Sequence, residues 1–178
     1  MFKKFDIKFF LIFAGLANIE DSGTTIKKLL VGAKNRKTFI QLISLKPIAS
    51  EQQIIFALEQ SMDSFAKKTN FSKSLELEFL TRLSGQRQIG KAMDLFGLGE
   101  GKNEVALILY SENKKNSEKL FDWVKKEIDF REKKNLISAN AKKNRKFIAE
   151  IYGIGKEEMK ILPLRESVLE RIAMVALS

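Results

Sequence analysis

Short apolar runs alternate with amphipathic segments along this chain, and this alternation constrains its fold more than any other feature. The runs that suggest strands are Ile7 to Leu16, Phe39 to Leu45 and Val105 to Leu109. Runs of this length that are rich in Phe, Ile, Leu and Val are typical of buried β-strands. Strands separated by helices predict an α+β fold, with a small, mostly antiparallel sheet packed against several helices.

Apolar residues that recur at helical spacing predict the helices. One helix begins at Ser50, whose hydroxyl can form a capping box with Gln53, and continues to about Lys68. Two more flank a turn at Ser84-Gly85. The other helices are expected over Ile26 to Ala33 after a Thr24 or Thr25 cap, along the stripe from Leu120 to Ile128, over Phe147 to Tyr152, and from about Arg165 to Leu177.

The length and even composition of the chain predict a single domain over residues 1–178. The chain has 178 residues, within the range of roughly 100 to 200 that one domain usually takes. Its hydrophobic content of 44% is too high for a disordered protein. No internal repeat and no shift in composition marks a second domain.

The first residues imitate a secretory signal peptide, because Met1-Phe2-Lys3-Lys4 precedes an apolar stretch from Phe9 to Ala17. Asp6 and Lys8 interrupt this pattern, and the stretch falls far short of the roughly 18 to 20 residues that span a bilayer. We therefore expect a buried strand here, a cytoplasmic protein and no membrane partner.

Two residue types are missing, and their absence excludes most catalytic chemistry. The chain has no Cys and no His. It therefore lacks a thiolate nucleophile, a Ser-His-Asp relay, and the Cys or His ligands of zinc sites. Asp, Glu, Lys and Tyr remain as possible acid–base groups, so a carboxylate- or lysine-dependent enzyme is one alternative. No set of these residues suggests a site, and we expect a non-catalytic protein with no metal and no cofactor.

The turn at Ser84-Gly85 is the segment most suggestive of a binding site. A helix start there would leave backbone amides unpaired, and such amides attract anions. The flanking Arg82 and Arg87 can grip a phosphate or stack on a base, and the net charge of +10 favours a polyanionic partner. Together with Ser84, Gly85, Gln86 and Gln88, these arginines are the parts of a small nucleotide-binding pocket, and Lys67 and Lys68 at the end of the preceding helix can extend a basic surface toward it. The alternative is an ordinary turn between helices with solvated polar residues.

Two other segments leave alternatives open. The stretch from Lys133 to Lys146 carries Lys and Arg without acidic residues or interleaved aromatics, so it predicts either a solvated face or a track for a phosphate backbone. The last helix, Ser167 to Leu177, is apolar on nearly every side after its first turn. It must bury more than one stripe, either in the core or partly against a partner protein.

The motif around the turn resembles the small non-catalytic subunit of the KEOPS complex, which binds the kinase-like ATPase of that complex in archaea and eukaryotes. The resemblance is carried by Ser84-Gly85-Gln86-Arg87-Gln88-Ile89 followed by Ala92 and Phe96-Gly97, by Glu78, Leu80 and Arg82 upstream, and by the strand at Val105 and Glu170-Arg171-Ile172-Ala173 downstream. It covers most of the chain thinly and residues 78–109 well. The expanded basic stretch departs from the usual pattern.

The resemblance implies a role in making threonylcarbamoyl-adenosine in tRNA, with the chemistry performed by other subunits. It implies a module that captures the single-stranded 3′ CCA end of tRNA, and a last helix that docks on the kinase-like ATPase. The implied RNA-binding residues are Lys67, Lys68, Arg82, Ser84, Gly85, Gln86, Arg87, Gln88 and Ile89. The implied docking residues are Val168, Leu169, Ile172, Ala173 and Ala176. Because no exposed aromatic is evident at the turn, base stacking is assigned to Arg87 or Ile89. The alternative function is a regulatory docking subunit that stimulates the ATPase without contacting RNA.

Overall fold

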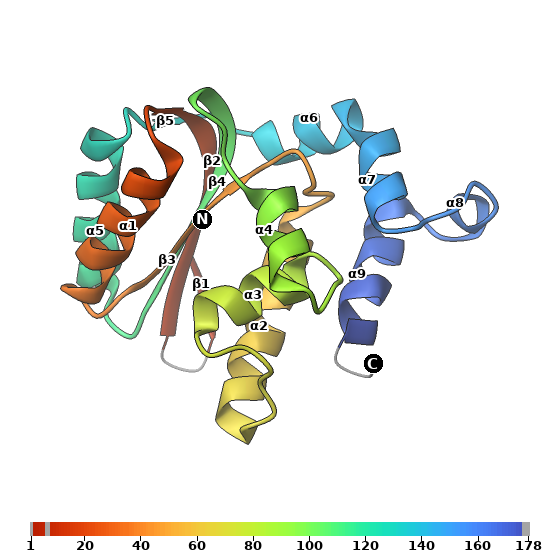
Figure 1. Cartoon of the computed structure of the whole chain (residues 1–178), viewed down its shortest axis with the longest axis horizontal. Helices are drawn as coiled ribbons and strands as arrows, with labels where there is room; N and C mark the ends of the chain where they lie inside the picture. Colours follow the sequence, from red (N-terminus) through yellow and green to blue (C-terminus); the bar gives the residue numbers. More distant parts are fainter. Residues whose placement is uncertain (1, 6–7, 176–178) are drawn as a thin grey trace. The chain divides into compact units, whose positions relative to one another are not determined.

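The computed structural model describes residues 2–5 and 8–175, and their contacts form two compact units (Figure 1). Unit 1 takes the chain up to Leu45 together with Leu98–Leu136. Unit 2 takes Lys46–Gly97 together with the chain from Ile137 onward. Each unit is therefore built from two separate stretches of sequence. The single domain expected from the sequence stays a prediction.

Unit 1 is built on an antiparallel sheet. Its strands are β1 (Phe2–Phe5), β2 (Lys8–Ile19), β3 (Phe39–Ser44), β4 (Gly101–Ser111) and β5 (Arg131–Glu132). The sheet order is β1-β2-β4-β3, with β5 also paired to β2, and every pairing is antiparallel. The predicted α+β class and antiparallel sheet are confirmed, and the run from Val105 lies in a central strand as its apolar sequence requires.

Helices α1 (Ser22–Lys34) and α5 (Lys114–Glu127) cover one face of this sheet (Figure 1). The core between them contains alternate strand residues together with Leu29, Leu120 and Val124 from the helices. The prediction that Thr24 or Thr25 caps the first helix was wrong. Asp21 is the N-cap, and its carboxylate accepts a hydrogen bond from the Thr24 amide.

The strand β1 was not predicted, because its lysines were interpreted as the basic start of a signal-like segment. It pairs with the beginning of β2, so that Phe2 lies opposite Leu11 in the register. Within residues 2–5 and 8–175, no helix is both long enough and apolar enough to cross a membrane.

Unit 2 is helical. Its helices are α2 (Glu51–Lys67), α3 (Leu75–Leu83), α4 (Ile89–Phe96), α6 (Leu136–Lys143), α7 (Arg145–Ile151), α8 (Glu158–Ile161) and α9 (Leu164–Val175). Helix α2 lies at the centre of the unit. The predicted capping box begins this helix, since Ser50 Oγ accepts from the Gln53 amide at 3.2 Å. In a capping box the Gln53 side chain would accept from the amide of Ser50. Here Gln53 Oε1 accepts instead from the amide of Ala49, one residue earlier, at 2.7 Å. Helix α2 contacts α3 and α9, and α3 also contacts α4.

Candidate nucleic-acid interface

The turn between α3 and α4 is the C-terminal cap of α3. The Gly85 amide donates to the Arg82 carbonyl at 3.0 Å, and the Gln86 amide donates to the Thr81 carbonyl at 3.2 Å. This pair of bonds is the Schellman motif, and it needs a left-handed residue that Gly85 supplies with φ of 67°. The expectation of free amides at Ser84 or Gly85 was therefore wrong, because these residues end a helix and do not begin one.

Ser84 is a buried part of this turn. Its hydroxyl donates to the Thr81 carbonyl at 2.7 Å and accepts from the Gln86 amide at 3.2 Å. A hydroxyl committed in this way shapes the turn, so a ligand contact through the Ser84 side chain is not supported.

The buried phenol of Tyr152 is hydrogen-bonded to the end of α3, just before the turn. Its hydroxyl donates to the Leu83 carbonyl at 2.7 Å and accepts from Gln53 Nε2 at 2.6 Å. Burial raises the pKa of the Tyr152 hydroxyl above its usual range and outweighs the Gln53 hydrogen bond, which lowers it. The phenol therefore stays protonated and keeps donating to the last carbonyl of α3, which fixes the position of the turn.

Arg82 is buried, and this overturns its predicted role as an open phosphate grip. Its side chain is 4% exposed, and its Nε and one terminal nitrogen each lie 2.8 Å from Glu78 Oε1. The two residues are one helical turn apart on α3, the spacing at which opposite charges meet. Sequence reasoning named Glu78 and Arg82 but could not see that both charges face the interior.

Glu78 also holds the loop between α2 and α3. Its second oxygen, Oε2, accepts from the amides of Phe71 and Ser72 at 3.1 and 2.9 Å. The Ser64 hydroxyl, near the end of α2, lies 3.2 Å from Oε1. A carboxylate that is 0% exposed and has this many donors is fully satisfied. It ties α2, the loop and α3 together.

Arg87 is exposed, and it lies beside an aromatic ring that the sequence analysis missed. Its guanidinium carbon is 5.6 Å from the centre of the Phe71 ring, and that of Arg82 is 5.0 Å from the same centre. Arg87 Nε also donates to the Val175 carbonyl at the end of α9, over a long 3.4 Å. Phe71 lies too far from the turn in sequence for any local pattern to have paired it with Arg87.

The helix start that was expected at Ser84 or Gly85 lies instead at α4. Gln88 is the N-cap of this helix and makes no side-chain capping hydrogen bond. Gly90 in the first turn has open space where a Cβ would be. Ile89 is half-buried and Gln88 is exposed. Uncapped amides beside the exposed Arg87 form an anion-accepting arrangement.

Lys67 and Lys68 lie at the end of α2, and both are exposed. Lys67 Nζ pairs with Asp63 at 2.8 Å on the same helix, a pair in which both side chains are more than half exposed. Lys68 is the left-handed C-cap, with φ of 57°. A position at the C-terminal end of a helix suits a basic residue even without a ligand, because of the helix dipole.

The predicted docking residues on α9 fall into two groups that differ in burial. Val168 and Ile172 are 0% exposed and lie in the core of unit 2, so their assignment to a docking surface was wrong. Leu169 and Ala173, one turn apart, are half-buried on the flank of that buried stripe. Ala176 lies outside the described residues. Met174, which the sequence analysis did not name, is also apolar and is 56% exposed on this helix.

Arg171 fixes α9 against the end of α7. Its Nε donates to the Tyr152 carbonyl at 3.1 Å, and a terminal nitrogen pairs with Glu158 at 2.7 Å. Its Cβ lies close to where a side chain on Gly85 would start. The motif residues Gly85 and Arg171 therefore meet around Tyr152, which links the turn to the last helix.

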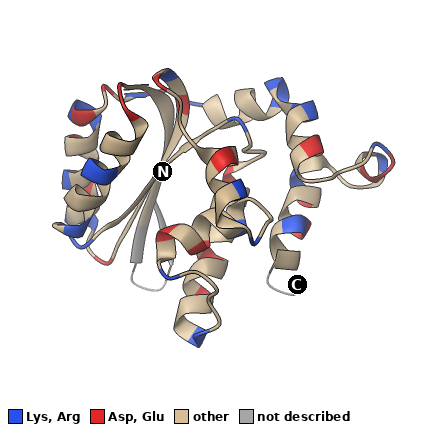
Figure 2. Cartoon of the chain, viewed as in Figure 1, with Lys and Arg blue, Asp and Glu red and all other residues tan. Residues whose placement is uncertain are grey.

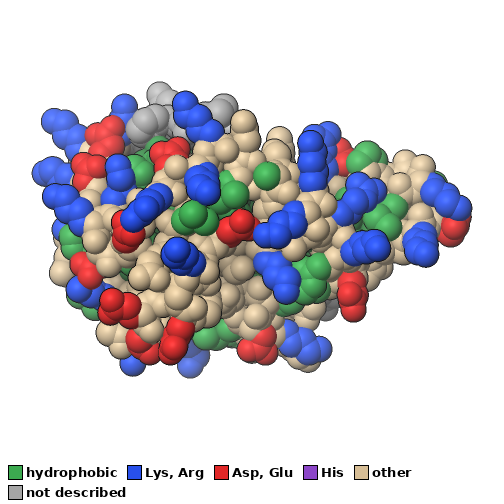
Figure 3. Space-filling model, turned by 90° about the horizontal axis from the view of Figure 1, so that it is seen from above, with side chains coloured by type: hydrophobic (Ala, Val, Ile, Leu, Met, Phe, Trp, Pro, Cys, Tyr) green, Lys and Arg blue, Asp and Glu red, His purple; other side chains and the backbone are tan. Residues whose placement is uncertain are grey.

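The basic residues of the stretch from Lys133 to Lys146 are exposed, whereas Asn140 within it is buried. The stretch consists of a loop, all of α6 and the start of α7 (Figure 2). On the face drawn in Figure 3, basic side chains are interspersed with acidic ones. This exposure is compatible with both alternatives left open by the sequence, a solvated face and a contact for the RNA backbone.

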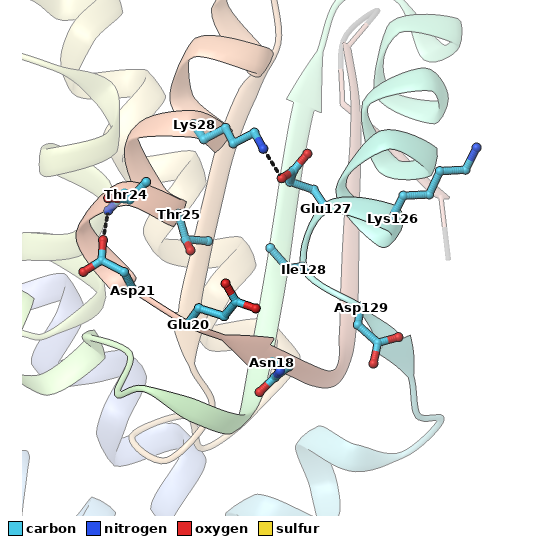
Figure 4. A pocket seen from close by; sticks show the side chains of 10 residues that line it. All are labelled: Asn18, Glu20, Asp21, Thr24, Thr25, Lys28, Lys126, Glu127, Ile128 and Asp129. Carbon is cyan, nitrogen blue, oxygen red and sulfur yellow. Dashed lines mark hydrogen bonds and ion pairs between the residues drawn. The ribbon is translucent and has the colours of Figure 1, made fainter.

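A polar pocket in unit 1, which the sequence analysis did not predict, has a volume of about 330 Å³. It lies between the end of β2, the start of α1 and the end of α5, and Figure 4 shows Lys28 reaching from α1 to Glu127 on α5. Asp21 is occupied in capping α1. Across the part of the chain that the structure describes, no group of acidic side chains is arranged to hold a metal ion.

Comparison with known proteins identifies the family. Residues 16–176 match the family described as "Kinase binding protein CGI-121". The chain is also similar to "Regulatory protein Cgi121" of Methanocaldococcus jannaschii, with 28% identity over 139 residues that cover 77% of this chain and 83% of the relative. The resemblance to the small KEOPS subunit is confirmed by these matches. The chain belongs to the CGI-121 family of kinase-binding proteins.

Proposed function

We propose that this protein is a non-catalytic tRNA-binding adaptor of the KEOPS complex. It holds the 3′ CCA end of tRNA in unit 2 and docks through α9 on the kinase-like ATPase, and so supports the threonylcarbamoyl-adenosine modification that other subunits carry out. The observation that carries the RNA-binding part is the exposed Arg87 guanidinium at the uncapped start of α4. The net charge of +10 supports a polyanionic partner.

The residues of this site divide into those that contact RNA and those that shape the site. Arg87 and the amides of the first turn of α4 would bind a phosphate, and the side chains of Gln86 and Gln88 would hydrogen-bond the edge of a splayed base. Lys67 and Lys68 would add attraction for the backbone. Arg82, Ser84 and Gly85 would hold the turn in place, since the contacts of all three are internal.

Arg87→Ala is expected to weaken tRNA binding by about 1 to 3 kcal/mol, because it removes a paired phosphate contact. Filter binding with purified tRNA measures this loss. The matched control is Arg131→Ala in unit 1, which removes the same charge from a side chain that is 72% exposed and paired with Asp129. Equal affinities of the two variants would show that Arg87 contributes only general charge.

The docking part of the proposal rests on the flank of α9. Leu169 and Ala173 are on one side of this helix and only half-buried, and an apolar flank of this kind suits packing on another protein. The description of the family as kinase-binding supports a kinase as the partner. If RNA binding is absent, this surface alone supports the second candidate function, a regulatory docking subunit of the kinase-like ATPase.

A further inference from the structure

The side chain of Phe71 is 39% exposed although the backbone that carries it is tightly held. It lies in the loop between α2 and α3, with the guanidinium groups of Arg82 and Arg87 at 5.0 and 5.6 Å from its ring centre. Single exposed apolar residues are common on protein surfaces. The surroundings of this one are unusual, because two cations lie near the same ring.

The loop that presents the ring is fixed by buried polar contacts. Glu78 accepts from the amides of Phe71 and Ser72, and Asn70 Nδ2 donates to the Ser72 carbonyl at 3.0 Å. Arg82 is held under the ring by its pair with the same Glu78. A ring that is already ordered loses little conformational entropy when a ligand packs on it.

The chemistry of this arrangement fits a nucleobase. Bases stack on aromatic rings and on guanidinium planes whatever their identity, because every base has a π face. A guanidinium beside the ring can bind the phosphate that follows the stacked base. Arg87 is exposed, and its contacts with the described residues are a long hydrogen bond and the ring, so it can turn toward a ligand.

We propose that Phe71 is the stacking platform for one base of the single-stranded RNA end, with Arg87 as its cationic partner and Glu78 as the residue that positions it. This inference rests on the proposed function and deepens it. It assigns base stacking to an aromatic residue of the α2–α3 loop, whereas the sequence assigned stacking to Arg87 or Ile89.

The test compares filter binding of intact tRNA and of tRNA without its CCA end, using the full chain. Phe71→Leu keeps an apolar side chain but removes the ring, and it is expected to lower the affinity for intact tRNA about 10- to 100-fold, the range of one lost stacking contact. Phe71→Tyr keeps the ring and is expected to bind like the wild type. Val31→Ala, at an exposed apolar position on α1, is the control and is expected to change nothing.

A second measurement keeps the test independent of stability. In Phe71→Trp, CCA-ended oligonucleotide is expected to quench fluorescence beyond the change seen with wild-type protein, whose tryptophan is Trp123 in unit 1. Unchanged affinity in Phe71→Leu, or equal losses in the Leu and Tyr variants, would overturn the stacking role. If wild-type protein binds intact and trimmed tRNA equally, the proposed function itself fails.

Discussion

Glu78→Ala is expected to lower the free energy of unfolding by about 3 to 5 kcal/mol, because it leaves the buried Arg82 charge unpaired. The Phe71 and Ser72 amides lose their acceptor at the same time, so the α2–α3 loop is expected to loosen. Equilibrium unfolding in urea measures the change. The effect is large because both partners of the pair are removed from water.

The matched control for Glu78→Ala is Asp63→Ala, which breaks the exposed pair with Lys67 at the same helical spacing. Exposed pairs of this kind contribute about 0.3 to 0.5 kcal/mol. Equal effects of the two substitutions would contradict the structural role given to Glu78. The double substitution of Glu78 and Arg82 by leucine is expected to recover much of the lost stability, since no charge then remains buried.

Leu169→Arg is expected to weaken association with the kinase-like ATPase at least about 100-fold, because it places an unpaired charge in an apolar contact; a loss of about 3 kcal/mol corresponds to that factor. Co-purification of the two proteins measures this loss. The isolated protein is expected to stay folded, since Leu169 is half-buried and a long arginine side chain can reach solvent.

Two further substitutions on α9 separate docking from folding. Ile172→Arg is expected to unfold unit 2, because that side chain is fully buried. Glu170→Arg changes an exposed side chain next to Leu169 in the sequence, and this variant is expected to keep its association with the kinase-like ATPase. If Leu169→Arg unfolds the chain as Ile172→Arg does, Leu169 belongs to the core and the docking surface lies elsewhere.

Local patterns were sufficient to predict the main elements of the fold. The cap at Ser50, the stripes around Gly85 and the apolar run at Val105 each depend on neighbours a few residues away, and α2, α3, α4 and β4 follow from them. The strands β1 and β5 were missed because they are short and their lysines, arginines and glutamates resemble loop sequence. Their formation depends on pairing with β2, which local sequence does not specify.

The candidate site was predicted in part. The sequence located the turn at Gly85 and the cation at Arg87, since glycine at a helix end and a flanking arginine are local signals. It did not reveal that Arg82 is buried, although Glu78 four residues earlier was a hint that the two charges pair. The Phe71 ring and the division of α9 into core and flank depend on the packing of α2, α3 and α9, which no local pattern contains.

Filter binding of wild-type protein to intact tRNA and to tRNA trimmed of its CCA end, repeated across salt concentrations, measures whether the protein recognises the tRNA end. General charge attraction weakens for both as salt rises. End recognition predicts that intact tRNA binds more tightly at every salt concentration, by roughly 10- to 100-fold for each stacked base that trimming removes. Equal affinities for the two tRNAs across the whole range would contradict the account.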